Sequence, residues 1–390
     1  MPQLKNIFEM RQTCGSRGVT VTALHFSIAV LLLARINGWA QPTNLPLFWK
    51  SRLSDIEAAV KEVKKGQARV LTKSAGGRNI FLLTYGEKQN LRSSANYNSA
   101  AAGGDPASYA WKDGTQRPVI FLLGPVHGQE FEGIVGLVNL VRIAETGRDY
   151  RGREWAELAG NFAKCRVLIV PAANPDGRAR CRFDSWVGED LNINERVGMG
   201  TKPDGANYRW PGVKRIHPMR GAPVGTLGAY FNDDGVNLMH DEWFDPMAPE
   251  TRALFKLARE EAPDFIVSLH SHAVDPSVEP TAYVARATKE TMKQFGDRLQ
   301  KRYADAGLPH RSGGGPEPKE DGEKFPPPSF NLTSALHHAC GAVSFVFECP
   351  AGVRTQPYPK LTHEQILDIE LLMYDELFKF ATEHPVKWAR

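Results

Sequence analysis

The stretch VIFLLGPVHGQEFEGIVGLVNLVRI (residues 119–143) indicates the fold class of this chain. Its first six residues, 119–124, form a continuous apolar run, which is typical of a strand buried on both faces of a sheet. Residues 130–143 then have the apolar periodicity of a helix. A buried strand that leads into a helix is the repeating unit of layered α/β folds.

Three more apolar runs predict buried strands, at residues 165–171 (CRVLIVP), 265–269 (FIVSL) and 342–347 (AVSFVF). Helical patterns occupy residues 250–262 and 362–382. We therefore expect a single domain of the α/β class, with a mixed, mostly parallel central sheet and helices on both of its faces.

Simpler elements precede the first buried strand. Residues 53–66 predict a helix, and residues 69–72 and 79–85 predict the two strands of a hairpin. Both elements belong to the same domain, because no linker separates two cores. We expect this domain to extend over residues 41–390.

Three segments rich in small and turn-forming residues are predicted to be loops: a loop insertion at 86–117, a long loop at 178–233, and a Gly/Pro-rich loop at 309–329. Long loops inside a compact domain commonly form the rim or the lid of a functional site.

The first 40 residues predict a secretory signal peptide. An apolar segment at 19–34 follows basic residues and precedes Gly38, Trp39 and Ala40. The segment is shorter than the about 20 apolar residues that span a bilayer, although an uncleaved membrane anchor is the alternative. We expect cleavage after Ala40 and a secreted or periplasmic protein without stable membrane insertion.

The composition is that of a soluble globular protein, with 42% hydrophobic and 24% charged residues and a net charge of +4. Residues 1–40 hold four basic residues against Glu9, a surplus of three, which leaves +1 for the remainder. A nucleic-acid partner would require a clustered basic face, so none is expected.

Five cysteines are present, and Cys14 lies in the expected signal peptide. The other four, Cys165, Cys181, Cys340 and Cys349, lack the C-x-x-C spacing of metal sites. In an oxidising compartment they would form one or two disulfides, or they are buried thiols.

Polar residues follow the predicted buried strands at their carboxyl ends. His127 and Glu130 come after the first of these strands, His270 and His272 after the third, and Glu348 after the fourth. Ligands of open α/β sheets bind outside the carboxyl ends of the strands. We therefore expect these side chains to meet at one site.

His127 and Glu130 form an H-x-x-E pair, which a strand-to-helix turn can bring onto one ion. A third ligand would be His270 or His272, which share a face in extended backbone. Two histidines and one carboxylate leave a coordination position for water, as in catalytic zinc sites, so we expect one Zn²⁺ per chain. The alternative is that His127 and Glu130 only stabilise the start of a helix.

Glu348 ends an apolar strand, where a carboxylate is costly unless it is paired or functional. Zinc lowers the pKa of a bound water to about 7, and a nearby carboxylate can accept its proton and return it to the leaving amine. We expect Glu348 to be this general base. The alternative is a structural carboxylate paired with an arginine.

Four motifs together resemble the zinc carboxypeptidase family: GPVHGQE (124–130), PAANPDG (171–177), FIVSLHSH (265–272) and FVFECPAG (345–352). They occur in the family's order, and the resemblance extends from about residue 53 to the end of the chain. It implies a carboxypeptidase-like sheet of about eight strands. It also implies His127, Glu130 and His270, rather than His272, as zinc ligands, and Glu348 as the base.

The chain departs from the motif with which the family holds the terminal carboxylate of its substrate. Where the family typically has G-V-D-x-N-R-N, this chain has GVNLMHD (235–241), with Met239 and His240 in place of Asn and Arg. Arginine binds a carboxylate through a bidentate fork that histidine cannot form. Asn237 and His240 are the candidate substrate-binding residues of this motif.

A second departure concerns the tyrosine that the family carries on a mobile loop before the base. No tyrosine lies between Tyr303 and Glu348, where Phe325 and Phe330 occupy the corresponding region. The arginine that would polarise the scissile carbonyl is expected to be Arg209 or Arg215.

These residues predict a zinc metallopeptidase that hydrolyses peptide bonds through metal-activated water. A deacylase, an amidase or a cell-wall peptide hydrolase on the same fold is the alternative. A non-catalytic binding module would lack a ligand or the base, and this sequence has both.

Overall fold

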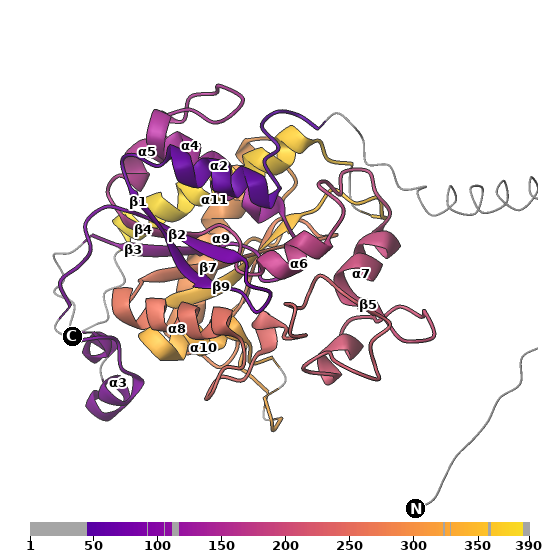
Figure 1. Cartoon of the computed structure of the whole chain (residues 1–390). Coiled ribbons are helices and arrows are strands. Elements are labelled where there is room, and N and C mark those ends of the chain that lie inside the picture. Colours follow the sequence, from indigo (N-terminus) through magenta and orange to yellow (C-terminus); the bar gives the residue numbers. More distant parts are fainter. Residues whose placement is uncertain are drawn as a thin grey trace, which may run out of the picture. The chain divides into compact units, whose positions relative to one another are not determined.

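A seven-stranded sheet forms the centre of the described part of the chain (Figure 1). The strand order is β1-β2-β4-β3-β7-β9-β8. The bounds are β1 Gln67–Lys73, β2 Asn79–Tyr85, β3 Val119–Leu123, β4 Arg166–Val170, β7 Phe265–His272, β8 Ser277–Glu279 and β9 Val343–Pro350. The computed structural model describes residues 45–91, 93–104, 106–110, 117–322, 324–327, 329–357 and 360–384.

The centre of the sheet is parallel and its edges are antiparallel. β4, β3, β7 and β9 run in the same direction, while β1, β2 and β8 pair antiparallel at the two sides. The predicted mixed sheet is therefore confirmed. In the described residues it has seven strands where about eight were expected.

Helices cover both faces of this sheet. Their bounds are α2 Leu53–Glu62, α3 Tyr97–Gly103, α4 Glu132–Thr146, α5 Ala156–Phe162, α6 Pro175–Arg180, α7 Leu191–Met199, α8 Pro249–Glu261, α9 Arg286–Asp305, α10 Leu332–Cys340 and α11 His363–Glu383. Side chains of α4, α9 and α11 join one apolar cluster, and those of α8 and α10 join a second. The sheet lies between the two clusters, so its central strands are buried on both faces.

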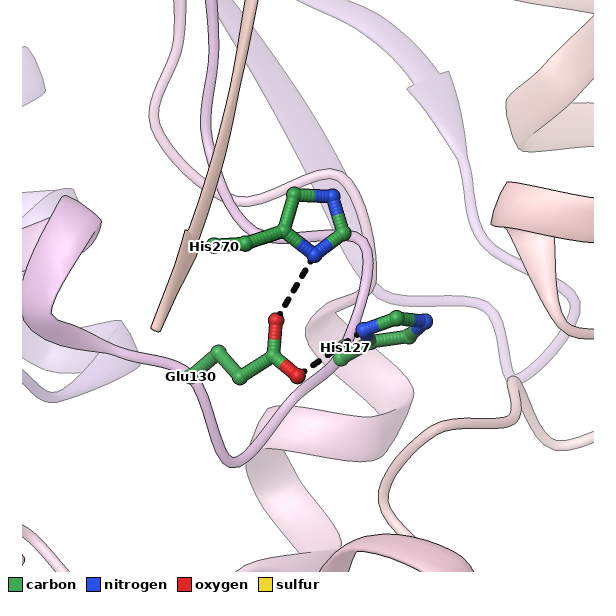
Figure 2. A group of neighbouring side chains, drawn as sticks. All are labelled: His127, Glu130 and His270. Carbon is green, nitrogen blue, oxygen red and sulfur yellow. Dashed lines mark hydrogen bonds and ion pairs between the residues drawn. The ribbon is translucent and has the colours of Figure 1, made fainter. Parts of the chain in front are cut away.

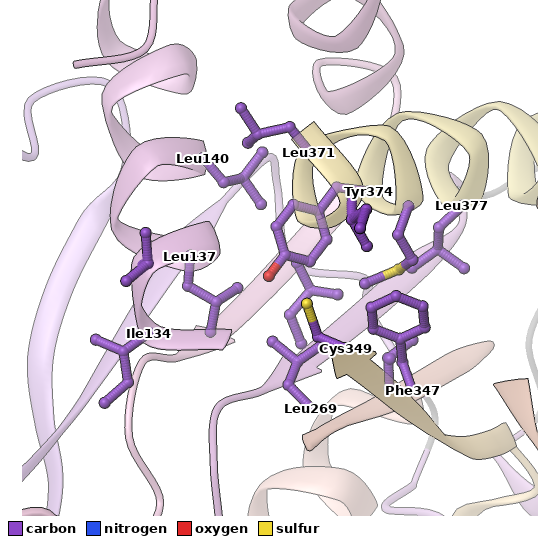
Figure 3. Packing of buried hydrophobic residues seen from close by; sticks show 14 of the residues in the cluster. Ile134, Leu137, Leu140, Leu269, Phe347, Cys349, Leu371, Tyr374 and Leu377 are labelled. Carbon is purple, nitrogen blue, oxygen red and sulfur yellow. The ribbon is translucent and has the colours of Figure 1, made fainter. Parts of the chain in front are cut away.

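The strands and the first cluster meet in a close-packed layer (Figure 3). Leu269 of β7 and Phe347 of β9 face Leu137 of α4 and Leu377 of α11, and all four are buried. All five residues of β3 are likewise buried, which explains its unbroken apolar run. Burial of this apolar surface is the main stabilising contribution to the fold.

The amino-terminal elements agree with the sequence, with one difference in length. β1 and β2 form the predicted antiparallel hairpin. Helix α2 ends at Glu62 rather than at residue 66, and Val63 is already extended. The chain then reaches Gly66, where a Cβ would lie 2.6 Å from the carbonyl oxygen of Thr84. This close approach to β2 requires glycine and ends the helical path.

Two of the predicted loops contain regular structure. The segment 86–117 holds α3 and the 3-10 turn Pro106–Tyr109, with Ala100 buried, so the prediction of a loop insertion outside the core is wrong there. The segment 178–233 holds α7, the 3-10 turn η2 (Gly212–Arg215) and the short strand pair β5 (Gly200–Thr201) and β6 (Thr226–Leu227). The described residues of 309–329 form no helix or strand, as expected.

Two other predictions concern the state of the cysteines and insertion into a membrane. Cys165, Cys181 and Cys349 are buried free thiols, and the thiol of buried Cys340 donates a hydrogen bond to the carbonyl of Leu336. No helix in the described ranges is both long and apolar enough to span a membrane. The expected signal peptide, residues 1–40, lies outside the described residues.

Candidate active site

The turn between β3 and α4 carries the first two candidate ligands, His127 and Glu130. Its backbone is held by a hydrogen bond from the Gly128 amide to the carbonyl oxygen of Ala229, 2.8 Å long. A Cβ at Gly128 would lie 2.0 Å from the carbonyl carbon of Gly177, so only glycine fits there. This contact joins the HGQE and NPDG motifs and fixes the position of the turn.

Strands β7 and β9 carry the other candidates. Both strands continue past their apolar runs, so His270 and Glu348 lie inside the sheet rather than beyond its edge. In the parallel register of the two strands His270 is paired with Glu348. Paired residues point to the same face, so the two side chains are neighbours on the α8/α10 face of the sheet.

The three candidate ligands converge on one point (Figure 2). The Glu130 carboxylate lies between two imidazoles, with Nδ1 of His127 at 2.9 Å from Oε1 and Nδ1 of His270 at 2.9 Å from Oε2. One ligand atom from each residue lies within 4.8 Å of the other two, and all three residues are buried. His272 lies outside this group and is partly exposed.

A hydrogen-bond partner on the far side of the His127 ring determines which ring nitrogen carries the proton. Its Nε2 lies 3.3 Å from Oδ1 of Asn237, and this oxygen already accepts a hydrogen bond from the amide of Met239. Nε2 must therefore donate, so that a neutral ring has its lone pair on Nδ1, facing the Glu130 carboxylate. Two acceptors at this distance repel each other unless a proton or a metal cation lies between them.

The donor set fits Zn²⁺. Two imidazole nitrogens and a carboxylate are common ligands of this ion. The Nε2 atom of His270 is 3.1 Å from Oγ of Ser268, so each ring has an oxygen partner on the side away from the candidate centre. Such outer partners orient the imidazoles of metal sites.

Burial and charge shift the pKa values at this centre in opposite directions. Burial favours a neutral Glu130, but the adjacent His127 and His270 outweigh it and lower the pKa of this carboxyl. Burial favours a neutral His270, yet the charges of Glu130 and Glu348 raise its pKa. The carboxylate is thus anionic and attracts a cation.

Glu348 is the acid beside this centre. Burial raises the pKa of its carboxyl, with the charge of His270 acting against this and that of Glu130 adding to it. Its Oε2 atom has no hydrogen-bond partner among the described residues. The charge of Arg311 also acts on Glu348, but the salt bridge of this arginine is to Glu279. The predicted alternative, a carboxylate paired with an arginine, is therefore not favoured among the described residues.

Tyr230 is a site residue that the sequence analysis missed. Its ring stacks on the imidazole of His127, with centroids 3.9 Å apart and planes 18° from parallel. Burial raises its pKa well above the usual value, and the charges of Glu130 and Glu348 add to this, so the phenol keeps its proton. It comes from the predicted loop 178–233, where no local pattern marks it.

The four candidate substrate-binding residues have different positions. Asn237 is buried against His127, as described above. His240 lies near the centre, and burial together with the charges of Lys214 and His127 lowers its pKa to about 3. Arg209 and Arg215 are exposed, and Arg209 faces Glu195 at 3.6 Å. In this structure neither arginine contacts the three candidate ligands.

Lys214 is a second residue that the sequence analysis missed. It lies in η2, and its Nζ is 4.3 Å from the ring centroid of Trp210, which in turn is 6.2 Å from the ring of His240. Burial lowers the pKa of this ammonium, and no carboxylate in the described ranges acts against the shift. A half-buried cation beside His240 is therefore left without an anionic partner.

The fold is a mixed α/β sheet, and its His-Glu-His group lies next to the buried carboxyl of Glu348. These two features are typical of the class of metal-dependent hydrolases. Comparison with known families gives a match to zinc carboxypeptidase over residues 58–307, which is more than half of the chain. The chain therefore belongs to the zinc carboxypeptidase family, and the protein is a zinc metallopeptidase.

Solved structures show the same fold. A metallo-carboxypeptidase from Burkholderia cenocepacia is 16% identical, with a TM-score of 0.52, over 85% of this chain and 68% of that chain. A Burkholderia mallei protein is 14% identical, also with a TM-score of 0.52, over 85% of this chain and 67% of that chain. No curated protein sequence matches the chain.

Proposed function

We propose that this protein hydrolyses peptide bonds at a single zinc site held by His127, Glu130 and His270, with Glu348 as the general base. The observation that carries the proposal is the convergence of these donor atoms within 4.8 Å, with the Glu130 carboxylate between the two imidazoles and facing Nδ1 of each. A metal cation at this point would stabilise the group, and its ligand types are those of catalytic zinc sites.

Zinc bound there would polarise the scissile carbonyl and lower the pKa of a water molecule. Glu348 accepts the proton of this water and passes it to the leaving amine. Its position beside His270 and its unpartnered Oε2 support this role. Tyr230, with its phenol protonated, offers a hydrogen-bond donor near Glu130 and Glu348.

Lys214 and His240 are proposed to hold the terminal carboxylate of the substrate. The ammonium of Lys214 has no carboxylate partner in the described ranges, and neutral His240 can add one N–H donor. Asn237 is proposed to orient His127 rather than to bind substrate. Arg209 remains a candidate for contacts with the outer part of a peptide, whereas exposed Arg215 is not proposed to contact the substrate.

The Lys214→Gln substitution is expected to lower kcat/KM for peptides with a free carboxyl terminus by about 10- to 100-fold, mostly through a higher KM. A charged hydrogen bond contributes about 1.5–3 kcal/mol, which accounts for this range. Amidated peptides, which lack the carboxylate, should be hydrolysed poorly by both forms. Steady-state kinetics on matched free and amidated peptides measures the effect.

Arg215→Gln is the matched control, because it removes an exposed cation one residue away and is expected to change kcat/KM little. An equal loss in the Arg215 variant, or no loss in the Lys214 variant, would refute the role of Lys214.

A second candidate function is hydrolysis of amides without a terminal carboxylate, by a deacylase, an amidase or a cell-wall peptide hydrolase. Met239 favours it, because this residue is buried in the apolar cluster of α8 and α10 and offers no polar contact where the family has an asparagine. Wild-type hydrolysis of amidated peptides at the rate of free ones would establish this second candidate.

A further inference from the structure

The residues that follow His270 and Glu348 point away from the candidate zinc site. Side chains alternate between the two faces of a strand, so Ser271 and Cys349 face α4 and α11 on the opposite side of the sheet. The register of β7 and β9 pairs Ser271 with Cys349, just as it pairs His270 with Glu348. A second row of polar side chains therefore lies directly behind the site.

Ser271 is bonded to Glu132 in this row. Its hydroxyl donates a hydrogen bond to Oε2 of Glu132 over 2.5 Å. Ser271 is 3% exposed and Glu132 is fully buried. Oε1 of Glu132 has no hydrogen-bond partner among the described residues, so the serine is the side chain that satisfies this acid.

The bond joins the two segments that carry the candidate ligands. Glu132 lies in the first turn of α4, two residues after Glu130, and Ser271 follows His270 in β7. These segments are far apart in the sequence. The salt bridge between Glu130 and His270 is the corresponding contact on the front of the sheet.

A similar contact lies beside it on α11. The hydroxyl of Tyr374 donates to Oε2 of Glu370 over 2.7 Å, and both residues are buried. Figure 3 shows the Tyr374 ring extending from α11 toward the sheet, where Cys349 lies. This second bond joins two residues of α11 and includes no residue of the Glu130 turn or of β7, so it offers a control of the same chemistry and burial.

We propose that Glu132 and Ser271 are positioning residues, whose hydrogen bond sets the distance between the Glu130 turn and His270 and thereby the affinity for zinc. The proposal rests on the ligand roles proposed above. Zinc binds tightly only where its ligands are held close to the required geometry, and partners outside the ligand shell commonly change metal affinity by about 10- to 100-fold.

The direct test is zinc affinity, measured by competition with a chromophoric chelator on full-length protein. Ser271→Ala is expected to bind Zn²⁺ about 10- to 100-fold more weakly than wild type, because Glu132 loses its donor and the two segments separate. The visible spectrum of the Co²⁺-substituted variant should also change, since it reports the ligand geometry. A wild-type affinity and spectrum would overturn the proposal.

Tyr374→Phe is the matched control. It removes a buried hydroxyl-to-carboxylate bond on the same face of the sheet, so it should lower the unfolding temperature as Ser271→Ala does, yet leave zinc affinity unchanged. An equal loss of zinc affinity in both variants would show that the effect is general destabilisation, and the proposal would be wrong.

Two substitutions of Glu132 test whether its role depends on the hydrogen bond to Ser271. Glu132→Gln keeps an oxygen that can accept from Ser271, so most of the zinc affinity should be retained. Glu132→Ala should lose as much affinity as Ser271→Ala. A loss in the glutamine variant as large as in the alanine variant would refute positioning through the hydrogen bond.

The failure of this proposal can be told apart from a failure of the zinc site itself. His270→Ala tests the site directly. If His270→Ala loses zinc while Ser271→Ala does not, only the positioning role is wrong. If His270→Ala binds zinc as wild type does, the ligand set is wrong and the positioning role with it.

Discussion

Glu348→Gln is expected to lower kcat for peptide hydrolysis by about 10²- to 10⁴-fold, the usual contribution of a general base. The amide keeps the shape of the side chain but has no lone pair basic enough to accept a proton from water. Zinc content should stay at one per chain, because Glu348 is not among the proposed ligands. Steady-state kinetics together with metal analysis of the same preparation measures both effects.

Glu279→Gln is the control for this substitution. Glu279 lies on β8 two residues after Ser277, which is paired with Glu348, so it is an acid on the same face of the sheet. It is bonded to Arg311 at 2.8 Å and partly exposed. Its variant should retain kcat within about threefold, as expected for a surface substitution. Full activity of the Glu348 variant would refute its role as base.

His270→Ala is expected to weaken zinc binding by more than about 100-fold, which is beyond the effect of removing an outer partner, and to abolish hydrolysis. One of the three proposed ligands is lost, and the Glu130 carboxylate loses the imidazole that faces its Oε2. Dialysis against a dilute chelator, followed by metal analysis, should leave well below one zinc per chain.

His272→Ala provides the comparison, because the residue lies on the same strand two positions away and is partly exposed. This variant should keep its zinc. Loss of zinc from His272→Ala with retention in His270→Ala would transfer the ligand role to His272.

The apolar runs predicted the centre of the sheet well, because strands buried on both faces have no polar positions to interrupt the pattern. The ends of β7 and β9 could not be predicted in the same way. Both strands continue through His270, Ser271, Glu348 and Cys349, where polar residues break the run although the backbone stays extended. There His270 and Glu348 face the candidate site, and Ser271 and Cys349 lie on the opposite face of the sheet.

The helices of the predicted loops were missed for a different reason. Helix α3 is short, its sequence YNSAAAG contains few large apolar residues, and its start is fixed by Asn96, whose side chain accepts from the amide of Ser99. Helix α7 is similarly begun by Asp190. Capping side chains of this kind compensate for a weak apolar pattern. The same residue types are also common in loops, so the composition of these segments predicted loops.

The candidate ligands and Glu348 could be proposed because each follows an apolar strand in a motif. Tyr230 and Lys214 could not, because their positions depend on how the segment 178–233 folds back over the site. Its small apolar cluster includes Tyr230, Val213 and Met219. No local spacing in the sequence encodes this arrangement, so only the three-dimensional structure relates these residues to His127 and His240.

The most direct measurement is anomalous diffraction at the zinc absorption edge from crystals of the zinc-loaded protein. The account predicts one strong peak per chain, within bonding distance of Nδ1 of His127, Nδ1 of His270 and the carboxylate of Glu130, with Glu348 nearby and not bonded to the metal. A peak bonded to other side chains, or no peak in crystals of protein that contains one zinc per chain, would contradict it.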